Sequence, residues 1–421
     1  MISRLRYAKA ISGKMLQAAA NVPLLMLTLI TATAHHAQSR EQSAAQSKRT
    51  SPGTYRLLYS FQCVFYDGGY PFAGLAGDPS GNLYGTTGDG GEFGYGTVFK
   101  VTPSGTERVI HDFPSYSTDG YDPYYGSLVR DTSGNLYGTT QLGGEFGHGT
   151  IFEVSSAGAE SVRYSFTGGA DGSEPVAGLA IDSADNLYGT ASGGGSYGNG
   201  VVFELTAGGT YSVLHSFASS PTDGAFPAST LARDPSGNLY GTTQNGGASS
   251  LGTIFKVTPS GAESLLHSFK GAPIDGAGPY GGGLLRDASG ALYGVTYAGG
   301  TGLHGELYRL NPGGAETVLF NFKGVVGASP IDGLARDGAG NLYGTTNYGG
   351  TGGGCGNYGC GVLFELSATG TETVLHEFSL KSSSDGALPL GGVVRNPSGV
   401  LYGTLSNGGA YGCGAVFQYT P

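Results

Sequence analysis

The tripeptide Leu-Tyr-Gly recurs seven times along this chain, at intervals of 50 to 59 residues. Its tyrosines are Tyr84, Tyr137, Tyr188, Tyr240, Tyr293, Tyr343 and Tyr402. A long and nearly constant period indicates a tandem array of one supersecondary unit. The repeat therefore constrains the architecture strongly, and it leaves the activity open.

Each repeat is expected to form four strands. In the unit at residues 227–269, four short runs rich in β-branched and aromatic residues are bounded by Gly, Pro, Asp, Asn or Ser, which is typical of strands. The Pro-Ser-Gly turn at 259–261 suits a hairpin loop with glycine in the left-handed conformation. In another unit Asp185 replaces this glycine, and aspartate tolerates that conformation.

Seven such units predict an all-β fold, a seven-bladed β-propeller with four strands per blade, over residues 54–421. The chain ends at 415–420, which matches a third strand, whereas residues 54–61 match the fourth strand at 371–378. We therefore expect the N-terminal strand to complete the last blade. This closes the ring and leaves no exposed sheet edge.

The first 34 residues have a different pattern. Basic residues at positions 4, 6, 9 and 14 precede an apolar stretch at 22–30 and the small residues 32–34. This order predicts a secretory signal peptide at 1–34. An uncleaved membrane anchor is the alternative, although the stretch is shorter than the roughly 20 residues that a span needs. The polar residues 35–53 are expected to form a flexible leader.

The charge of the chain limits its partners. A formal net charge of −10 argues against nucleic acid and against anionic membrane surfaces, both of which attract basic proteins. We expect a secreted monomer, extracellular or periplasmic, with no membrane contact after signal cleavage.

The motif Gly-Asn-Leu-Tyr-Gly-Thr-Thr at 81–87, followed by Gly-Thr-Val-Phe-Lys-Val-Thr at 96–102, resembles the GloVer-type tandem repeat of exported bacterial proteins. The resemblance covers essentially everything after residue 53. It implies an exported, β-propeller-like protein and no particular activity. Such proteins often carry a C-terminal anchoring signal, whereas this chain stops at Pro421 within the last blade, so release is favoured. The first half of each unit is also similar to the NHL-type propeller repeat.

Two regular sets of polar residues are expected to be structural. The motif Asp-Gly-x-x-Pro begins at Asp67, Asp119, Asp171, Asp223, Asp275 and Asp385, and the sixth repeat has Val326 instead. Calcium needs six to eight oxygen ligands, which these isolated aspartates do not supply, so we interpret them as turn residues, together with the hairpin aspartates such as Asp78. A second position holds histidine, tyrosine or phenylalanine, as at His111, Tyr59 and Phe320, and this exchange indicates a packing position.

The loop between the second and third strands varies most between repeats. Its candidate binding residues are Glu92, Tyr95, Glu145, His148, Tyr197 and His304. The loop lies on the face of a propeller that also carries the blade connections, and loops on a rigid scaffold commonly bind ligands. Aromatic rings beside carboxylates suit a sugar or a peptide. The alternative is unselected drift of the loop sequence.

Five arginines share one position at the end of the first strand. They are Arg130, Arg233, Arg286, Arg336 and Arg395. In a closed ring they would form a partial collar at the opposite mouth of the central channel, where guanidinium groups suit carboxylate or phosphate. The alternative is that each arginine pairs with a nearby turn aspartate.

These features favour a secreted, non-catalytic propeller that binds a glycan or an extracellular protein. One alternative is a polysaccharide lyase or hydrolase at the channel mouth, with Glu92 and Glu145 as the suggestive carboxylates. Another is a structural envelope protein. The sequence has no zinc-ligand spacing, nucleophile elbow or phosphate-binding motif, so we expect no catalytic residue, metal or cofactor.

The four cysteines are expected to form two disulfides, Cys63–Cys413 and Cys355–Cys360. The second would be a local bridge within a lengthened loop. If the third and fourth strands pair without interruption, Tyr95 lies opposite Phe113. By repeat alignment, Cys413 then lies opposite Phe61, one diagonal step from Cys63, and the bridge would staple the ring where the chain ends meet.

Overall fold

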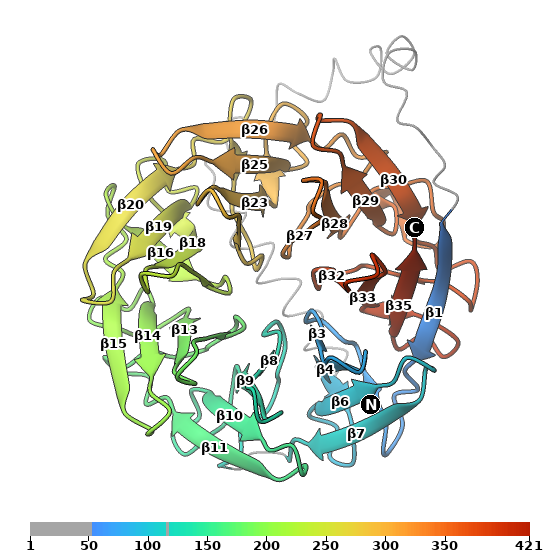
Figure 1. Cartoon of the computed structure of the whole chain (residues 1–421), viewed down its shortest axis with the longest axis horizontal. Coiled ribbons are helices and arrows are strands. Elements are labelled where there is room, and N and C mark those ends of the chain that lie inside the picture. Colours follow the sequence, from blue (N-terminus) through green and yellow to red (C-terminus); the bar gives the residue numbers. More distant parts are fainter. Residues whose placement is uncertain (1–52, 115–117) are drawn as a thin grey trace. The chain divides into compact units, whose positions relative to one another are not determined.

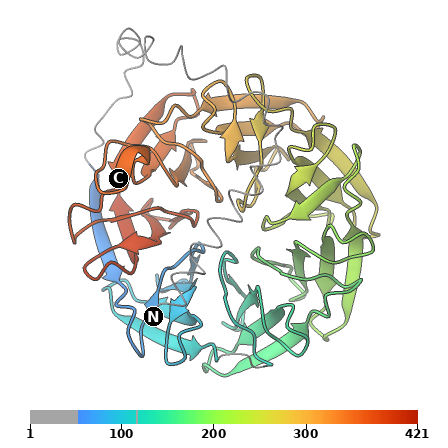
Figure 2. The same ribbon diagram turned by 180° about the vertical axis from the view of Figure 1, so that it is seen from behind.

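The computed structural model describes residues 53–114 and 118–421. The predicted signal peptide and nearly all of the predicted leader lie outside the described residues. Within the compact unit at 47–421, seven antiparallel blades follow one another around a ring, as Figure 1 shows, and Figure 2 gives the same ring from behind. The predicted seven-bladed β-propeller is therefore confirmed.

Each blade has four strands, ordered from the centre of the ring outward. The innermost strands of blades 1 to 7 are β3 (Ala76–Gly77), β8 (Val129–Arg130), β12 (Ala180–Ile181), β17 (Ala232–Arg233), β22 (Leu285–Arg286), β27 (Ala335–Arg336) and β32 (Val394–Arg395). The second strands are β4 (Leu83–Thr87), β9 (Leu136–Thr140), β13 (Leu187–Ala191), β18 (Leu239–Gly246), β23 (Leu292–Thr296), β28 (Leu342–Thr346) and β33 (Leu401–Leu405). The third strands are β6 (Thr97–Val101), β10 (Thr150–Val154), β14 (Val201–Leu205), β19 (Thr253–Val257), β25 (Glu306–Leu310), β29 (Val362–Leu366) and β35 (Ala415–Thr420). The outer strands are β7 (Glu107–Asp112), β11 (Glu160–Ser165), β15 (Tyr211–Ser216), β20 (Glu263–Ser268), β26 (Glu316–Asn321), β30 (Glu372–Glu377) and β1 (Thr54–Ser60).

In four blades, short strands join the blade connection to the loop after the second strand, and in the other three an isolated bridge does so. The short strands are β2 (Gly68–Gly69) with β5 (Asp89–Gly90), β16 (Gly224–Pro227) with β18, β21 (Gly276–Ala277) with β24 (Ala298–Gly299), and β31 (Gly386–Ala387) with β34 (Asn407–Gly408). One 3-10 helix, η1 (Gly356–Tyr358), lies in the lengthened loop of blade 6.

The N-terminal strand closes the ring, as the sequence predicts. Strand β1 pairs antiparallel with β35, so Thr54 lies opposite Thr420 and Ser60 opposite Ala415. Blade 7 is thus built from both parts of the chain, and its outer edge is the first described strand (Figure 1).

Aromatic pairs fill every interface between blades. The phenylalanine after each outer strand meets the aromatic residue of the next blade's third strand, as Phe61 meets Phe99 with 5.0 Å between ring centres. The other pairs are Phe113–Phe152, Phe166–Phe203, Phe217–Phe255, Phe269–Tyr308, Phe322–Phe364 and Phe378–Phe417. These rings are almost fully buried, and edge-to-face contacts of this kind add to the hydrophobic stabilisation of the ring.

The structure gives each residue of Leu-Tyr-Gly a separate task. In blade 1, Leu83 is buried in the core, and the Tyr84 hydroxyl donates a hydrogen bond to the turn residue Asp78. Gly85 lies under the ring of Phe99, where a Cβ atom would stand 2.6 Å from a ring carbon. Glycine is required there because the aromatic ring approaches the backbone.

One register expectation is wrong by one residue. In every outer hairpin a bulge interrupts the pairing, so that Val98 lies opposite His111 but Phe99 lies opposite Val109. Phe113 therefore donates its backbone N–H to Gly96, not to Tyr95. The bulge inserts an extra residue into the outer strand and increases its twist, which uninterrupted pairing does not anticipate.

Candidate functional site

The antiparallel blades give the ring two chemically different faces. The hairpin turns between strands one and two and between strands three and four lie on one side, called here the turn face. The loops between strands two and three and the blade connections lie on the other, called the loop face. Backbone pairs such as Gly68 with Gly90 and Tyr121 with Leu142 join the two kinds of loop.

Aspartates organise the turn face. In blade 1, Asp78 accepts hydrogen bonds from the backbone of Ser80 and Asn82 and from the Tyr84 hydroxyl. Burial tends to raise the pKa of Asp78, but the hydrogen bonds from Asn82, Tyr84 and Ser80 outweigh it and hold the pKa below its usual value. The same bond from tyrosine reaches the aspartates of the next five blades, Asp131, Asp182, Asp234, Asp287 and Asp337. The predicted turn role of these residues is confirmed.

The five arginines of the predicted collar lie at this turn face. Each guanidinium group packs beside the turn glycine of its own blade, at Gly134, Gly237, Gly290, Gly340 and Gly399. Arg233 also lies 5.4 Å from the ring centre of Tyr188 and 3.5 Å from Asp182 Oδ2, both in the preceding blade. The Arg336 guanidinium lies 5.7 Å from the ring centre of Tyr293. The Arg233–Asp182 pair matches the structural alternative for one of the five arginines, and anion binding by the collar stays a prediction.

The loop face holds the exposed apolar surface. Among residues 53–114 and 118–421, every exposed large apolar side chain except Val213 lies in one of its loops. In the loops after the second strands these are Phe93, Phe146, Tyr197, Tyr297, Leu303, Tyr358 and Tyr411. In the blade connections they are Val64, Phe65, Tyr66, Phe226, Ile274, Val325 and Leu380. A concentration of this kind on one face is typical of an interaction surface.

Five of the six loop residues predicted to bind are exposed on this face. They are Glu92, Glu145, His148, Tyr197 and His304. Tyr95 instead turns inward and packs against Tyr121, with 5.6 Å between ring centres. Phe93 is the exposed ring of that loop, and Phe146 takes the same position in the next blade. No contact between Glu92 and Glu145 is found within the described part of the chain, so their pairing in catalysis stays a prediction.

A repeated backbone feature displays variable side chains on the loop face. The residue before the proline of each blade connection has φ between 53° and 58°, the left-handed region. These display positions hold Tyr70, Asp122, Glu174, Phe226, Gly278, Ser329 and Leu388. Six of them are not glycine, and such residues are strained in this conformation.

Hydrogen bonds to two neighbouring loops hold each display position. The backbone N–H of Asp122 donates to Tyr95 of the preceding blade, and its C=O accepts from Gln141 of its own blade. The other repeats use equivalent bonds, such as those of Glu174 with His148 and Ser192. The position is therefore fixed in backbone and varied in side chain, and it is not among the binding residues predicted from the sequence. The signal was available, because this residue always precedes the proline of the Asp-Gly-x-x-Pro motif.

Further aromatic residues gather where the blade connections enter the innermost strands. Phe72 stacks on Tyr124 with ring centres 5.0 Å apart, and both lie near Tyr125. Tyr280 lies 6.4 Å from Tyr297. Burial and then the neighbouring Tyr280 raise the pKa of Tyr125. We call Phe72, Tyr124, Tyr125, Tyr280 and Tyr297 the mouth cluster.

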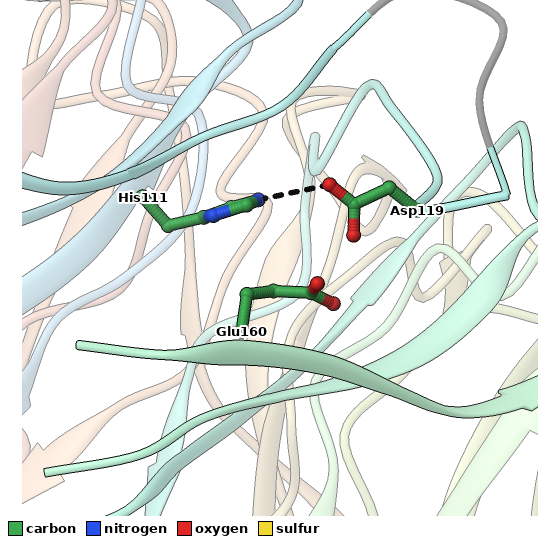
Figure 3. A group of neighbouring side chains, drawn as sticks. All are labelled: His111, Asp119 and Glu160. Atoms are coloured by element: carbon green, nitrogen blue, oxygen red, sulfur yellow. Dashed lines mark ion pairs between the residues drawn. The ribbon is translucent and has the colours of Figure 1, made fainter. Parts of the chain in front are cut away.

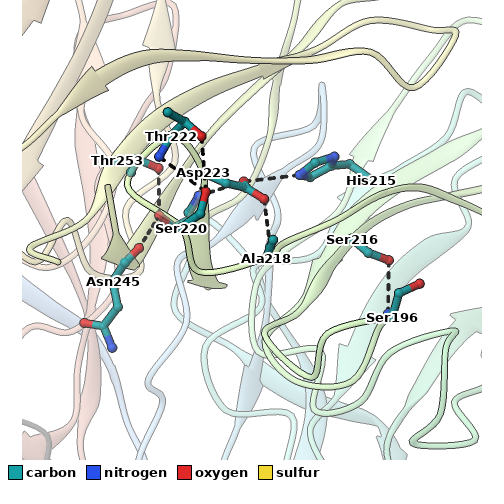
Figure 4. Close-up of polar contacts among 11 residues, drawn as sticks. Ser196, His215, Ser216, Ala218, Ser220, Thr222, Asp223, Asn245 and Thr253 are labelled. Atoms are coloured by element: carbon teal, nitrogen blue, oxygen red, sulfur yellow. Dashed lines mark hydrogen bonds and ion pairs between the residues drawn. The ribbon is translucent and has the colours of Figure 1, made fainter. Parts of the chain in front are cut away.

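The interfaces between blades carry polar groups at their outer rim. His111 Nε2 lies 3.3 Å from Asp119 Oδ2, and Glu160 of the next blade points at both groups (Figure 3). In the corresponding place His215 pairs with Asp223, which also accepts the backbone N–H of Ala218 (Figure 4).

Histidine and tyrosine have the same function at this position. The Tyr59 hydroxyl donates a hydrogen bond to Asp67, and in the equivalent place of another blade the His215 ring pairs with Asp223. Where the aspartate is replaced by Val326, the histidine position holds Phe320. The position is therefore more than a packing position, because its residue follows the identity of the connection residue.

Both predicted disulfides are present. Cys63 and Cys413 have Cα atoms 5.8 Å apart, and Cys355 and Cys360 have Cα atoms 5.3 Å apart. Because of the bulge in blade 7, Phe61 donates its backbone N–H to Gly414 and not to Cys413. Cys413 is thereby one position closer to Cys63 than uninterrupted pairing predicts.

Comparison with known proteins settles the family. The Gloeobacter/Verrucomicrobia repeat matches residues 47–180, 126–355 and 235–421, which together span the propeller. The chain belongs to the Gloeobacter/Verrucomicrobia repeat family. This confirms the resemblance drawn from the motifs. No curated protein matches the chain.

Solved structures share the fold at low sequence identity. One is an extracellular domain assigned to a hybrid two-component system of B. thetaiotaomicron, BT3049, with 15% identity, a TM-score of 0.56, and coverage of 88% of this chain and 41% of the other. A second, from BT4673 of the same organism, has 12% identity, a TM-score of 0.54, and coverage of 86% and 39%. This repeat-family chain thus spans about two fifths of those structures. Among its own described residues, no helix is long and apolar enough to cross a membrane.

Proposed function

We propose that this repeat-family protein is an exported, non-catalytic propeller that binds a neutral glycan on its loop face. The observation that carries the proposal is the display positions, where the same backbone conformation holds a different residue type in each blade, with Glu174 and Phe226 exposed to solvent. Loops that vary on a rigid scaffold are the usual place for recognition. The turn face, in contrast, repeats the same aspartate and tyrosine contacts from blade to blade.

The side chains of the loop face favour a sugar. Exposed rings such as Phe93 and Tyr197 offer flat apolar surfaces. Amide side chains are available at Gln141, directly after β9, and at Gln244, on β18, which bonds to Tyr280 of the mouth cluster. Aromatic surface with a few polar groups is the usual composition of a small-ligand site, and it suits a pyranose ring, which has apolar faces and polar edges.

The charges of this face favour a neutral ligand. Exposed glutamates lie in the loops of blades 1 to 3, at Glu92, Glu145 and Glu174. Exposed lysines follow the outer strands of blades 4 to 6, at Lys270, Lys323 and Lys381. A polyanion would meet repulsion over half of the ring. The extracellular propellers with the same fold support an exterior location for this protein.

Affinity electrophoresis through gels that contain a soluble neutral polysaccharide tests the proposal. We expect a panel of β-glucan, xylan and galactomannan to include at least one that retards the full chain, while alginate and pectate do not. Replacing Phe93, Phe146 and Tyr197 together by alanine should restore free migration. Val213→Ala is the matched control, because Val213 is also an exposed apolar side chain but lies outside the loop face.

The same polysaccharides, incubated with the protein and analysed for reducing ends and unsaturated products, test the enzymatic alternative. Product formation that is lost in Glu92→Gln would replace the proposal by the lyase or hydrolase hypothesis. Migration unchanged by every polysaccharide, with no product formed, would contradict glycan binding and leave an extracellular protein as the partner.

A further inference from the structure

The interface between blades 4 and 5 differs from the other six in its buried polar groups. At the first position of the third strand, Thr97, Thr150 and Thr253 bond to a threonine of the second strand, but blade 5 has Glu306. The Glu306 side chain has 0% exposure, and neither of its oxygens has a hydrogen-bond partner among the described residues. Buried polar groups are normally paired, so an unpaired carboxyl group requires an explanation.

The same interface contains a second exception two residues further along β25. Blade 5 has Tyr308 where every other blade has phenylalanine, and its hydroxyl is fully buried without a partner within the described residues. Residues at this spacing on a strand point to the same side, so Tyr308 and Glu306 both face blade 4.

A His–Asp–Glu group lies at the rim of this interface. His267 Nε2, on β20 of blade 4, is 3.2 Å from Oδ2 of Asp275 in the blade connection. Glu316, on β26 of blade 5, places a carboxylate oxygen within 4.8 Å of both. Its Oε1 is buried and has no hydrogen-bond partner in the described chain. The three side chains come from three separate segments, which is why their spacing in the sequence shows no ligand pattern.

Glu306 lies directly behind this group. Its Oε1 is next to Gly276, whose N–H already donates to Asp275 Oδ1 across 2.8 Å. Asp275 accepts the backbone N–H groups of Lys270 and Gly276, whereas Glu306 and the Oε1 atom of Glu316 have no hydrogen-bond partner among the described residues. A cation between these carboxyl groups would relieve the cost of burying them.

We propose that the interface between blades 4 and 5 binds one divalent transition-metal ion through His267, Asp275 and Glu316, with Glu306 as a further carboxylate. An imidazole with carboxylates suits Zn²⁺, which takes four nitrogen and oxygen ligands, better than Ca²⁺, which takes six to eight oxygens. The ion would link two blades across their interface, so its role is structural. The proposal is independent of glycan binding.

Two other interfaces provide internal comparisons. The groups at His111, Asp119, Glu160 and at His215, Asp223, Glu263 have the same three residue types. Behind them, however, stand Thr150 and Thr253, which are satisfied by their own hydrogen bonds. In all three groups the rim glutamate has a buried oxygen without a partner, but within the described residues only the interface of blades 4 and 5 adds a second, fully buried glutamate, Glu306.

Thermal unfolding of the full chain with and without Zn²⁺, after treatment with a chelator, tests the proposal. We expect Tm to rise with Zn²⁺ at pH 7.5 and to return to its starting value with excess chelator, because a ligand that binds only the folded state stabilises it. Glu306→Thr introduces the threonine that three other blades have at this position. His267→Tyr introduces the tyrosine that two other blades have at the equivalent position, as Tyr59 and Tyr164. Both substitutions therefore suit the fold, and both should abolish the Zn²⁺-dependent rise.

The matched control is His111→Tyr, which changes a rim histidine at another interface and should keep the full rise. Isothermal titration should show a Zn²⁺-binding event in the wild type that is absent from Glu306→Thr. An unchanged Tm of the wild type in Zn²⁺ would overturn the proposal. So would an equal rise in Glu306→Thr and the wild type, because the ion would then be bound elsewhere.

Discussion

The hydroxyl of Tyr240 donates a hydrogen bond to Oδ2 of Asp234 across 3.0 Å, and it ties the second strand of blade 4 to the turn before it. The same carboxylate accepts the backbone N–H groups of Ser236 and Asn238. One buried aspartate thus satisfies both the turn and the strand, and this explains why tyrosine and aspartate recur together in the repeats.

Asp234→Ala should therefore destabilise the protein by about 2–3 kcal/mol, because it leaves several donors without their charged acceptor. Tyr240→Phe, which removes only one of these bonds, should cost about 1 kcal/mol. Urea unfolding followed by circular dichroism measures both. Equal stability of Asp234→Ala and the wild type would show that the turn is held by other contacts.

The Cys63–Cys413 bridge joins the two ends of the ring over a sequence separation of 350 residues. On the loop-entropy model, replacing both cysteines by serine should cost on the order of 5 kcal/mol. The Cys355–Cys360 bridge, with a separation of 5 residues, should contribute only about 2 kcal/mol on the same model. Comparison of the two double variants by denaturant unfolding checks this order, and a greater loss from the short bridge would contradict it.

Because the Glu372 carboxyl group is buried, we expect the free energy of unfolding to decrease as the solution becomes more alkaline. The side chain is 6% exposed, and burial raises its pKa to about 7. Because the folded-state pKa exceeds that of the unfolded chain, its contribution is complete below about pH 4.3 and is lost as the pH rises through 7. Glu372→Gln should remove roughly 3 kcal/mol of this pH dependence between pH 4 and 9.

Denaturant unfolding at several pH values measures the difference between Glu372→Gln and the wild type. Glu145→Gln, which changes an exposed glutamate, is the control and should leave the pH dependence unchanged. If Glu372→Gln and the wild type have parallel stability curves, Glu372 is not the group responsible.

The arginine collar predicts that citrate raises the Tm of the wild type above its value in chloride of equal ionic strength. The double variant Arg233→Ala with Arg286→Ala should lose this rise. Its Tm in chloride should also fall, because Arg233 packs on Tyr188 and pairs with Asp182. Arg163→Ala changes an arginine of the outer strand β11 that pairs with Glu153 on β10, and it should keep the full effect of citrate. If the double variant keeps it as well, citrate binds at another site.

The repeat made most of the fold predictable. Strand number, ring closure and disulfide pairing follow from motif order and from the match between residues 54–61 and 371–378, and all three are confirmed. The pairing between the third and outer strands was predicted with an error of one residue, because a bulge depends on the twist of the assembled blade. Tyr95 was predicted to bind a ligand with the other loop residues, and it packs instead against Tyr121 because neighbouring loops meet there.

The sequence by itself determined the seven blades, their closure and the residue types at each turn, because these depend on local propensity and on a period repeated seven times. Only the tertiary structure decided which side chains meet across the interfaces. His267, Asp275, Glu306 and Glu316 become neighbours because two blades pack side by side. The display positions come to lie on one face because closing the ring brings seven separate connections together there. Such juxtapositions depend on contacts between distant segments, which no local pattern records.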